Sequence, residues 1–404
     1  MRRRLLELIG VMIVIMAVTA LLKLAPVPVE GQAPTAAGEA GKTPAVPTPW
    51  NEPDLQGIWT TEYETPLQRP ARFANQEVFT DEERAALDGE RATILGRDPR
   101  PSQGSPLGTG GAYNRAIFLS HKPTGRRTSL IADPRDGKIP PFTAEAQQRR
   151  NAIRDYQLAL LRATDTCKNN LPDCAGGQYG PPSPRRAETP PHYLIALVNR
   201  ADGPEDRSLG ERCMSGQLPD FGGAAGFFLQ IVQSPGTVSI FYDTGQGQAW
   251  QRIIPVTDRP HLPSHMRQWW GDSRGRWEGK TLVVDVTNFS PKTDFQGSRE
   301  NLHLVERWTR LDAATIKYVV TMDDPTTWMS PWTVELELSR QSNEANRIYK
   351  EPRCHEGNYG LPALLRGARA EELAFAERRG PDPATLCNAD CGSAFIGENR
   401  DPLR

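Results

Sequence analysis

The sequence predicts a mainly β protein with peripheral helices, an α+β fold whose strands form an antiparallel up-and-down meander, either a barrel or a sandwich. Between residues 227 and 356, short apolar segments follow one another at roughly ten-residue spacing. Turn-forming residues, such as those at 234–236 and 243–247, separate most of these segments. The 404-residue chain also contains 35 glycines and 36 prolines, which favours many turns around an ordinary core.

The alternation of side chains along each predicted strand assigns one face to the interior. Four consecutive segments, which begin near residues 281, 301, 315 and 332, each carry an apolar face. We expect these faces to meet in one interior, lined by Leu282, Val284, Val286, Leu302, Leu304, Glu306, Trp308, Arg310, Ile316, Tyr318, Val320, Met322, Trp332, Val334, Leu336 and Leu338.

Five regions follow one another along the chain. Residues 1–33 are predicted to be a signal peptide or an N-terminal anchor, and 34–52 form a linker rich in Ala, Pro and Gly. Residues 53–226 hold an opening strand, two helices and a loop with two cysteines. The meander occupies 227–356, and 357–404 form a C-terminal helix and an irregular tail.

The N-terminus has the features of an export signal. Arg2 to Arg4 form a positive segment, and Leu8 to Leu22 form an uncharged apolar run. Cleavage after Ala33 leaves a mature protein without this run, whereas an uncleaved run that includes neighbouring residues is long enough for an anchor. Both alternatives place the remainder of the chain in the periplasm or outside the cell, with membrane contact only through the N-terminal segment.

Six cysteines agree with an exported protein, because an even number in an oxidising compartment indicates disulfides. We expect two local bridges and one distant bridge. Their spacings do not match the closely spaced cysteine pairs of structural zinc sites. The expected pairs are Cys167–Cys174, Cys387–Cys391 and Cys213–Cys354.

Helix boundaries are signalled by capping residues. Thr80 and Glu83 form a capping box at the start of one predicted helix. Thr143 is the expected N-cap of a second helix, and a third is expected over residues 361–379. The Asp136-Gly137 pair predicts a tight turn just before Thr143.

Glu306 is the exception on the apolar face of its strand. A buried carboxylate needs a partner, and Arg310 on the same face is the expected one. One interpretation is a structural ion pair, and the other is a polar anchor inside a ligand cavity. His303 falls on the opposite face of this strand, so we do not expect it to share a site with Glu306.

Seven of the nine tryptophans lie between residues 250 and 332, where they either fill a core or line a binding site. The stretch from Trp269 to Phe289 is predicted to be a hairpin that turns at residues 271–275. It places three tryptophans at one end of the sheet, near a cavity mouth. The predicted ligand-binding residues are Glu306, Arg310, Trp269, Trp270, Trp277, Trp308, Tyr318 and Arg274.

Acid–base chemistry is the alternative function, with Glu306, Asp285, Asp272 and His303 as candidate catalytic residues. His261 and His265 have the spacing of a helical metal pair, but Pro260 and Pro263 break a helix there. We therefore predict no metal site and no cofactor. Convergence of two or more members of one set would favour an enzyme. That set is His261, His265, Asp272, Asp285, His303 and His355.

Four long segments resemble a family of uncharacterised exported bacterial proteins: SLIADPRDGKIPPFT, RPHLPSHMRQWWGDSRGRWEGKTLVVDVTNF, NLHLVERWTRLDAATIKYVVTMDDPTTWMSPWT and CHEGNYGLPALLRGARAEE. The resemblance implies export but no activity. The chain also resembles lipocalin-like barrels in the G-x-W of residues 57–59 on a first strand. About 165 residues separate this Trp from the meander, which is more than those barrels allow.

Three functions remain open. The first is binding of a small apolar or glycosidic ligand in the interior or mouth of the meander. The second is an extracytoplasmic hydrolase or lyase, and the third is a structural or interaction subunit of an envelope complex. A net charge of −1 excludes a strong electrostatic attraction to nucleic acid, and no feature of the sequence indicates an oligomeric state.

Overall fold

The computed structural model divides the chain into two compact units, Met1–Glu39 and Ala40–Arg404. The predicted targeting segment falls outside the described residues, and among the described helices none is long and apolar enough to cross a membrane. The described residues are 47–61, 65–95, 124–171, 174–191, 199–207, 209, 211–214, 218–221, 228–245, 248–341 and 359–387.

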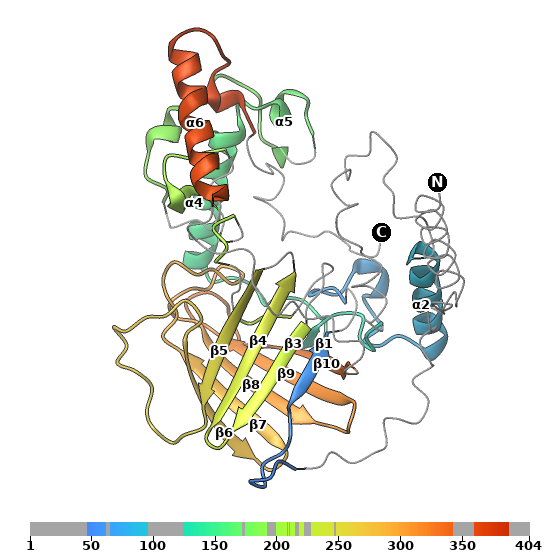
Figure 1. The fold of residues 1–404 in the computed structure, drawn as a ribbon. Helices are drawn as coiled ribbons and strands as arrows, with labels where there is room; N and C mark the ends of the chain where they lie inside the picture. The colour runs from blue at the N-terminus through green and yellow to red at the C-terminus, as the bar shows by residue number, and fades with distance from the viewer. Residues whose placement is uncertain are drawn as a thin grey trace, which may run out of the picture. The chain divides into compact units, whose positions relative to one another are not determined.

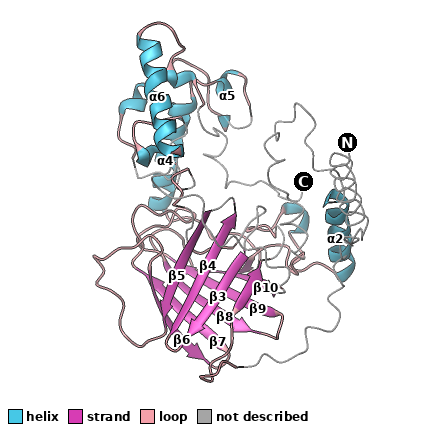
Figure 2. Cartoon of the chain, in the orientation of Figure 1, coloured by secondary structure: helices cyan, strands magenta, loops and turns pink. Residues whose placement is uncertain are grey.

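A ten-stranded sheet with antiparallel pairing forms the body of the fold (Figures 1 and 2). Its strand order is β5-β4-β3-β1-β10-β9-β8-β7-β6, with β2 paired to β10 beside that path. The strands are β1 (Gly57–Thr60), β2 (Ile131–Asp133), β3 (Phe228–Ser234), β4 (Thr237–Gly245), β5 (Gln248–Pro255), β6 (Asp272–Glu278), β7 (Thr281–Thr287), β8 (His303–Arg310), β9 (Thr315–Asp323) and β10 (Trp332–Arg340).

The sheet curls back on itself into a nearly closed barrel, which confirms the predicted fold class and decides between its two alternatives. Figure 1 shows β3, β4 and β5 in front of β7, β8 and β9. The two ends of the strand order, β5 and β6, meet at one place, where Val256 and Gly275 form a parallel bridge. The amide of Thr257 donates to the carbonyl of Gly275 at 3.0 Å.

The hairpin formed by β6 and β7 corrects the prediction for residues 269–289. Residues 272–275 belong to a strand, and the chain turns later, at Gly279 with φ of 59°. Gly275 serves close packing, since a Cβ there would lie 3.1 Å from a methyl carbon of Ile254 on β5. Trp270 precedes β6 and Trp277 lies near its end, so the expected cluster of tryptophans at one end of the sheet is wrong.

The first strand, β1, lies inside the barrel wall despite its distance in sequence from the meander. Trp59 pairs with Leu229 of β3 on one side and with Arg340 of β10 on the other. Its indole is fully buried and donates to the carbonyl of Leu55 at 3.0 Å. The G-x-W segment therefore forms part of the barrel wall, despite the long separation in sequence that argued against this.

One continuous core fills the barrel, and it includes the apolar residues predicted to line the interior. The register aligns inward-facing residues in rows across neighbouring strands, such as Leu282, Trp308, Tyr318 and Leu336. Glu306 belongs to the next row, between Val284 and Val320. The alternation of side chains was therefore sufficient to assign these faces.

The helices begin where the capping residues predict. Thr80 accepts from the amide of Glu83 at 3.1 Å, and the Glu83 carboxylate accepts from the amide of Thr80 at 2.7 Å. Thr143 accepts from the amide of Ala146 at 3.1 Å. The helices are α2 (Asp81–Leu95), α4 (Ala144–Leu161), α5 (Asp165–Lys168) and α6 (Gly360–Ala376), with short 3-10 helices η2 (Ala71–Phe73), η5 (Pro184–Ala187), η6 (Pro204–Asp206) and η7 (Pro383–Thr385).

The disulfide between Cys167 and Cys174 is present, as expected for a local bridge. Cys213 and Cys387 are also disulfide-bonded. Cys354 and Cys391 lie outside the described residues, so the other two pairings stay predictions.

Candidate functional site

A polar network lies at the centre of the barrel, around the carboxylate of Glu306. Glu306 is fully buried on β8, and Arg252 of β5 reaches it across the interior with two hydrogen bonds of 3.0 and 2.6 Å. The hydroxyl of Tyr318 donates to the same carboxylate at 2.8 Å. Arg252 also donates to the hydroxyl of Ser273 on β6 at 2.9 and 3.0 Å. The network thus joins β5 to β6 and β8 where the barrel wall is least continuous.

Burial and the charges of the network shift the pKa values of Arg252, Tyr318 and Tyr242. Burial by itself lowers the pKa of Arg252, but the carboxylate of Glu306 outweighs burial and the pKa lies above its usual value. Burial raises the pKa of Tyr318 well above its usual value, and the neighbouring carboxylate raises it further. Burial likewise raises the pKa of Tyr242, which lies beside Arg252. Both tyrosines are therefore neutral at physiological pH, and Tyr318 donates to Glu306.

Arg310 is not the partner of Glu306, so that expectation is wrong. Its guanidinium donates to the carbonyls of Asp312 and Ala313 at 2.5 and 2.7 Å, in the turn after β8. It also lies 4.5 Å from the ring of Trp59. The carbonyls of the turn after β8 hold Arg310 at the end of this strand. Glu306 pairs instead with Arg252 from the distant strand β5.

The aromatic residues predicted to bind ligand are divided between two parts of the core. The rings of Trp308 and Tyr318 lie 4.3 Å apart, close to Glu306. Trp270 stacks on Trp250, which stacks in turn on Tyr242. Trp277 is half-buried and packs against the core. Trp269 is half-buried just before β6.

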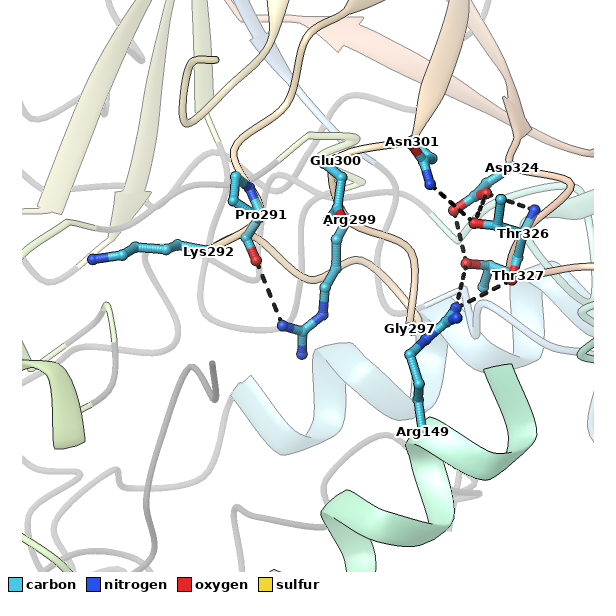
Figure 3. Close-up of a pocket in the computed structure, with 10 residues that line it drawn as sticks. All are labelled: Arg149, Pro291, Lys292, Gly297, Arg299, Glu300, Asn301, Asp324, Thr326 and Thr327. Carbon is cyan, nitrogen blue, oxygen red and sulfur yellow. Dashed lines mark hydrogen bonds between the residues drawn. The ribbon is translucent and has the colours of Figure 1, made fainter. Parts of the chain in front are cut away.

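A cavity of about 340 Å³ lies at the rim of the barrel, and we call it the rim pocket (Figure 3). It lies between the β7–β8 loop, the β9–β10 loop and the first turns of α4. Its lining is polar and charged, without aromatic residues. The lining residues are Arg149, Pro291, Lys292, Gly297, Arg299, Glu300, Asn301, Asp324, Thr326 and Thr327.

Asp324 fixes the walls of the rim pocket. Its two carboxylate oxygens accept hydrogen bonds from the hydroxyls of Ser298, Thr326 and Thr327 at 2.5 to 2.7 Å. Burial alone would raise the pKa of Asp324, but these hydrogen bonds outweigh burial and hold the pKa below its usual value. One carboxylate therefore ties the β7–β8 loop to the β9–β10 loop.

Three cationic side chains line the rim pocket. Arg299 is held by the carboxylate of Asp294 through contacts of 3.0 and 3.1 Å, and Figure 3 shows its guanidinium projecting into the space between Lys292 and Arg149. Arg149 donates to the carbonyl of Thr326 at 3.1 Å. These groups are already positioned by the protein, so a bound anion would not have to order them.

Outside the barrel, two aspartates and two histidines form a continuous chain of hydrogen bonds. His261 lies between the carboxylates of Asp272 and Asp285, with Nδ1 at 2.9 Å and Nε2 at 2.8 Å from their oxygens. The second oxygen of Asp285 lies 2.8 Å from Nε2 of His303. Arg274 donates to the other oxygen of Asp272 at 2.6 Å. We call Asp272, His261, Asp285 and His303 the Asp–His chain.

The hydrogen bonds of the Asp–His chain determine where its protons lie. An ionised carboxylate only accepts, so Nε2 of His303 carries a proton. The hydrogen bond from His303 holds the pKa of Asp285 below its usual value. The same hydrogen bond raises the pKa of His303, with further support from the charge of Asp323. The imidazole of His303 is 40% exposed.

Sequence reasoning named the four members of the Asp–His chain but not their arrangement. Four of the six residues whose convergence would favour an enzyme do converge. His265 is exposed and lies apart from the chain, and His355 is outside the described residues. Arg274, predicted to bind ligand, contacts Asp272, and its role in binding stays a prediction.

The alternation of side chains along the strands could have predicted part of this arrangement. Asp285 pairs with Val305 across β7 and β8, so it lies diagonally opposite His303 on the same outer face. His261 comes from the irregular segment before β6, and no periodicity signals its position. Sequence reasoning also missed Arg252. It missed the cationic side chains of the rim pocket as well, which come from the β7–β8 loop and from α4.

No protein-family model matches this chain, and no curated protein does. Among solved structures, a secretary abundant heat soluble (SAHS) protein from Ramazzottius varieornatus is similar, with 8% identity and a TM-score of 0.20 over 28% of this chain and 71% of that one. The fluorescent protein UnaG is similar with 17% identity and a TM-score of 0.18, over 29% of this chain and 72% of that one. The functional reasoning below therefore depends only on the residues of this chain.

Proposed function

We propose that the protein is an exported binding protein that takes up a small acidic, glycosidic compound in the rim pocket. The observation that carries this proposal is the cavity of about 340 Å³ lined by Arg149, Lys292 and Arg299. Its volume falls within the range of small-molecule sites, which is about 300–1,000 Å³. The disulfide between Cys167 and Cys174 supports export, because such bonds persist in oxidising compartments.

The charge of the lining favours an anion. Arg149, Lys292 and Arg299 line the pocket together with Glu300 and Asp324, and Asp324 already accepts hydrogen bonds with both oxygens. Lys292 also pairs with Glu205 at 2.6 Å, and Arg299 with Asp294 at 3.0 Å. Arginine presents a planar set of donors that matches a carboxylate. A ligand carboxylate between Arg299 and Arg149 would therefore meet donors from both sides.

The remaining lining favours hydroxyl groups over hydrocarbon. Thr326, Thr327 and Asn301 supply hydroxyl and amide groups, and the lining has no aromatic or large aliphatic side chain. Of the two ligand classes that the sequence suggested, the glycosidic one suits this lining. The barrel interior is less suited to a ligand, because Glu306 and Arg252 are buried and satisfy each other there.

Mass spectrometry of compounds co-purified with the exported protein tests the proposal. We expect an acidic, hydroxyl-rich compound on the wild-type protein and at least tenfold less of it on Arg299→Met. Arg276→Met is the matched control, because Arg276 also pairs with a single acid, Glu278 at 2.8 Å, but on the exposed face of β6. This control should retain the compound at the wild-type level.

Two results would contradict the proposal. One is a retained compound that is apolar and uncharged, and the other is equal retention by Arg299→Met and Arg276→Met. Thermal melting of both variants shows whether a loss of the compound reflects the pocket or a loss of the fold.

A further inference from the structure

We propose that the Asp–His chain and the rim pocket form one catalytic centre, in which His303 is the general base for β-elimination from a uronic-acid glycoside. This inference rests on the proposed function, because it takes the acidic glycosidic compound of the rim pocket as the substrate. It goes further by assigning a reaction to the outer face of the barrel.

The position of His303 next to the rim pocket is the first argument. Asn301, which lines the pocket, lies two residues before His303, where β8 begins. Across the sheet, His303 pairs with Asp323, and the next residue, Asp324, also lines the pocket. His303 at the start of β8 and its partner Asp323 at the end of β9 therefore both lie at the edge of the pocket.

The orientation of the imidazole is the second argument. Asp285 accepts from Nε2 of His303, which leaves Nδ1 as the basic nitrogen, and the described residues make no hydrogen bond to it. Asp285 is itself fixed on its other oxygen by His261, which Asp272 holds in turn. A carboxylate that fixes the tautomer and orientation of a histidine is the arrangement that general-base catalysis requires.

The chemistry of the two parts is complementary. A proton on the carbon next to a carboxylate becomes more acidic when cations neutralise that carboxylate, and Arg299 and Arg149 are placed to do so. Hydrolysis by the usual route needs two acidic groups at the bond that is cleaved. The exposed end of the Asp–His chain offers one base, which favours elimination.

The elimination step balances without a co-reactant. Nδ1 of His303 takes the proton from the carbon next to the carboxylate, and the electron pair of that C–H bond forms a double bond to the neighbouring carbon. The C–O bond to the departing sugar breaks there, and its electron pair stays on the oxygen. The proton returns from Nδ1 of His303 to this oxygen, so the imidazole ends the cycle neutral, with its proton on Nε2.

The test uses polygalacturonate, polyglucuronate and alginate as probes, with the ultraviolet absorbance of the new double bond as the readout. We expect turnover of at least one probe by the wild-type protein and a loss of about 100-fold or more in kcat for His303→Asn. His265→Asn is the matched control, since His265 is exposed and makes none of the hydrogen bonds that form the Asp–His chain. It should keep the wild-type rate.

The role of Asp285 as a positioning residue has its own readout. The raised pKa of His303 places the rise of kcat/KM with pH above about 6.5, the usual value for histidine. The groups around this imidazole are Asp285 and Asp323, with His261, Asp272 and Arg274 behind Asp285. Asp285→Asn removes the main cause of the raised pKa, so it should move this rise to lower pH as well as reduce kcat.

The outcomes separate this inference from the proposed function. Co-purified ligand on the wild-type protein, kept by His303→Asn, together with no turnover of any probe, would overturn the inference and leave the binding function standing. Turnover that His303→Asn does not reduce would also overturn it. No bound ligand and no turnover would overturn both. Turnover lost in His303→Asn, with the bound ligand kept, supports both.

Discussion

The carboxylate of Glu306 shows how a single residue is accommodated in an apolar interior. It accepts from Arg252 through two hydrogen bonds and from Tyr318 through a third. Both charged groups are removed from water, so each depends on the other for compensation. Their contribution to stability is therefore best measured as a pair.

We predict that Glu306→Leu and Arg252→Met each lower the free energy of unfolding by about 3–5 kcal/mol, because each leaves one buried charge without its partner. The double variant should lose much less than the sum, since it removes both charges. Urea unfolding of the four proteins measures the coupling. Additive losses would show that the two side chains act independently.

The sequence was informative at this scale only about the face of Glu306. Alternation along β8 placed it inside, and this was sufficient to predict a buried partner. The partner itself comes from β5, which lies at the opposite end of the strand order from β6. Local spacing suggested Arg310, which lies on the same face of the same strand. Spacing along one strand cannot show which distant strands meet when a sheet closes.

At the scale of elements, the start of α4 links a helix cap to the rim pocket. The side chain of Thr143 caps the helix, and its hydroxyl also donates to the carbonyl of Thr326 at 3.0 Å. The amide of Thr143 donates to the carbonyl of Thr327 at 3.0 Å. Arg149, two turns into the same helix, reaches the pocket. A change at the cap should therefore alter both stability and ligand binding.

We predict that Thr143→Ala costs about 1 kcal/mol in the free energy of unfolding and weakens retention of the co-purified ligand. Thr80→Ala is the matched control, because Thr80 caps α2 with a bond of the same length and has no contact with the rim pocket. It should cost a similar free energy without loss of ligand. Equal ligand loss in both variants would indicate a general effect of lower stability.

Capping residues predicted the boundaries of helices better than glycines predicted the positions of turns. Thr80, Glu83 and Thr143 act through bonds within one helical turn, so local sequence determines them. Gly275 was interpreted as part of a turn, but it lies within β6 because β5 approaches it closely. The sequence alone does not distinguish a glycine needed for close packing from one needed for a turn. Only the position of the neighbouring strand does so.

At the scale of the whole molecule, the charged clusters set how stability depends on pH. Asp324 and Asp285 have lowered pKa values, so their contribution is fully present above about 3.9, the unfolded value, and is lost as the pH falls through the folded values. His303 has a raised pKa. Its contribution is fully present below about 6.5 and is lost as the pH rises through the folded value.

We therefore predict that these groups stabilise the protein most between about pH 4 and pH 6.5. Urea unfolding across a pH series checks this. Asp324→Asn should make the decline on the acid side shallower, and His303→Asn should do the same on the alkaline side. A pH dependence unchanged by either substitution would show that other groups control it.

The closure of the sheet into a barrel was the feature least predictable from the sequence. Strand spacing and turn residues indicated a meander, but barrel and sandwich share that pattern. The choice depends on β1 and on the meeting of β5 and β6, which are contacts between distant parts of the chain. The rim pocket has the same origin, because its lining comes from two loops and from α4.

The location of β1 between β3 and β10 also sets when the protein can fold. Trp59 pairs with Leu229 on one side, but its other neighbour, Arg340, is synthesised only near the end of the chain, so the earliest strand lacks its second partner until then. Contacts of such separation form slowly. The barrel therefore cannot close until its last strand has been synthesised.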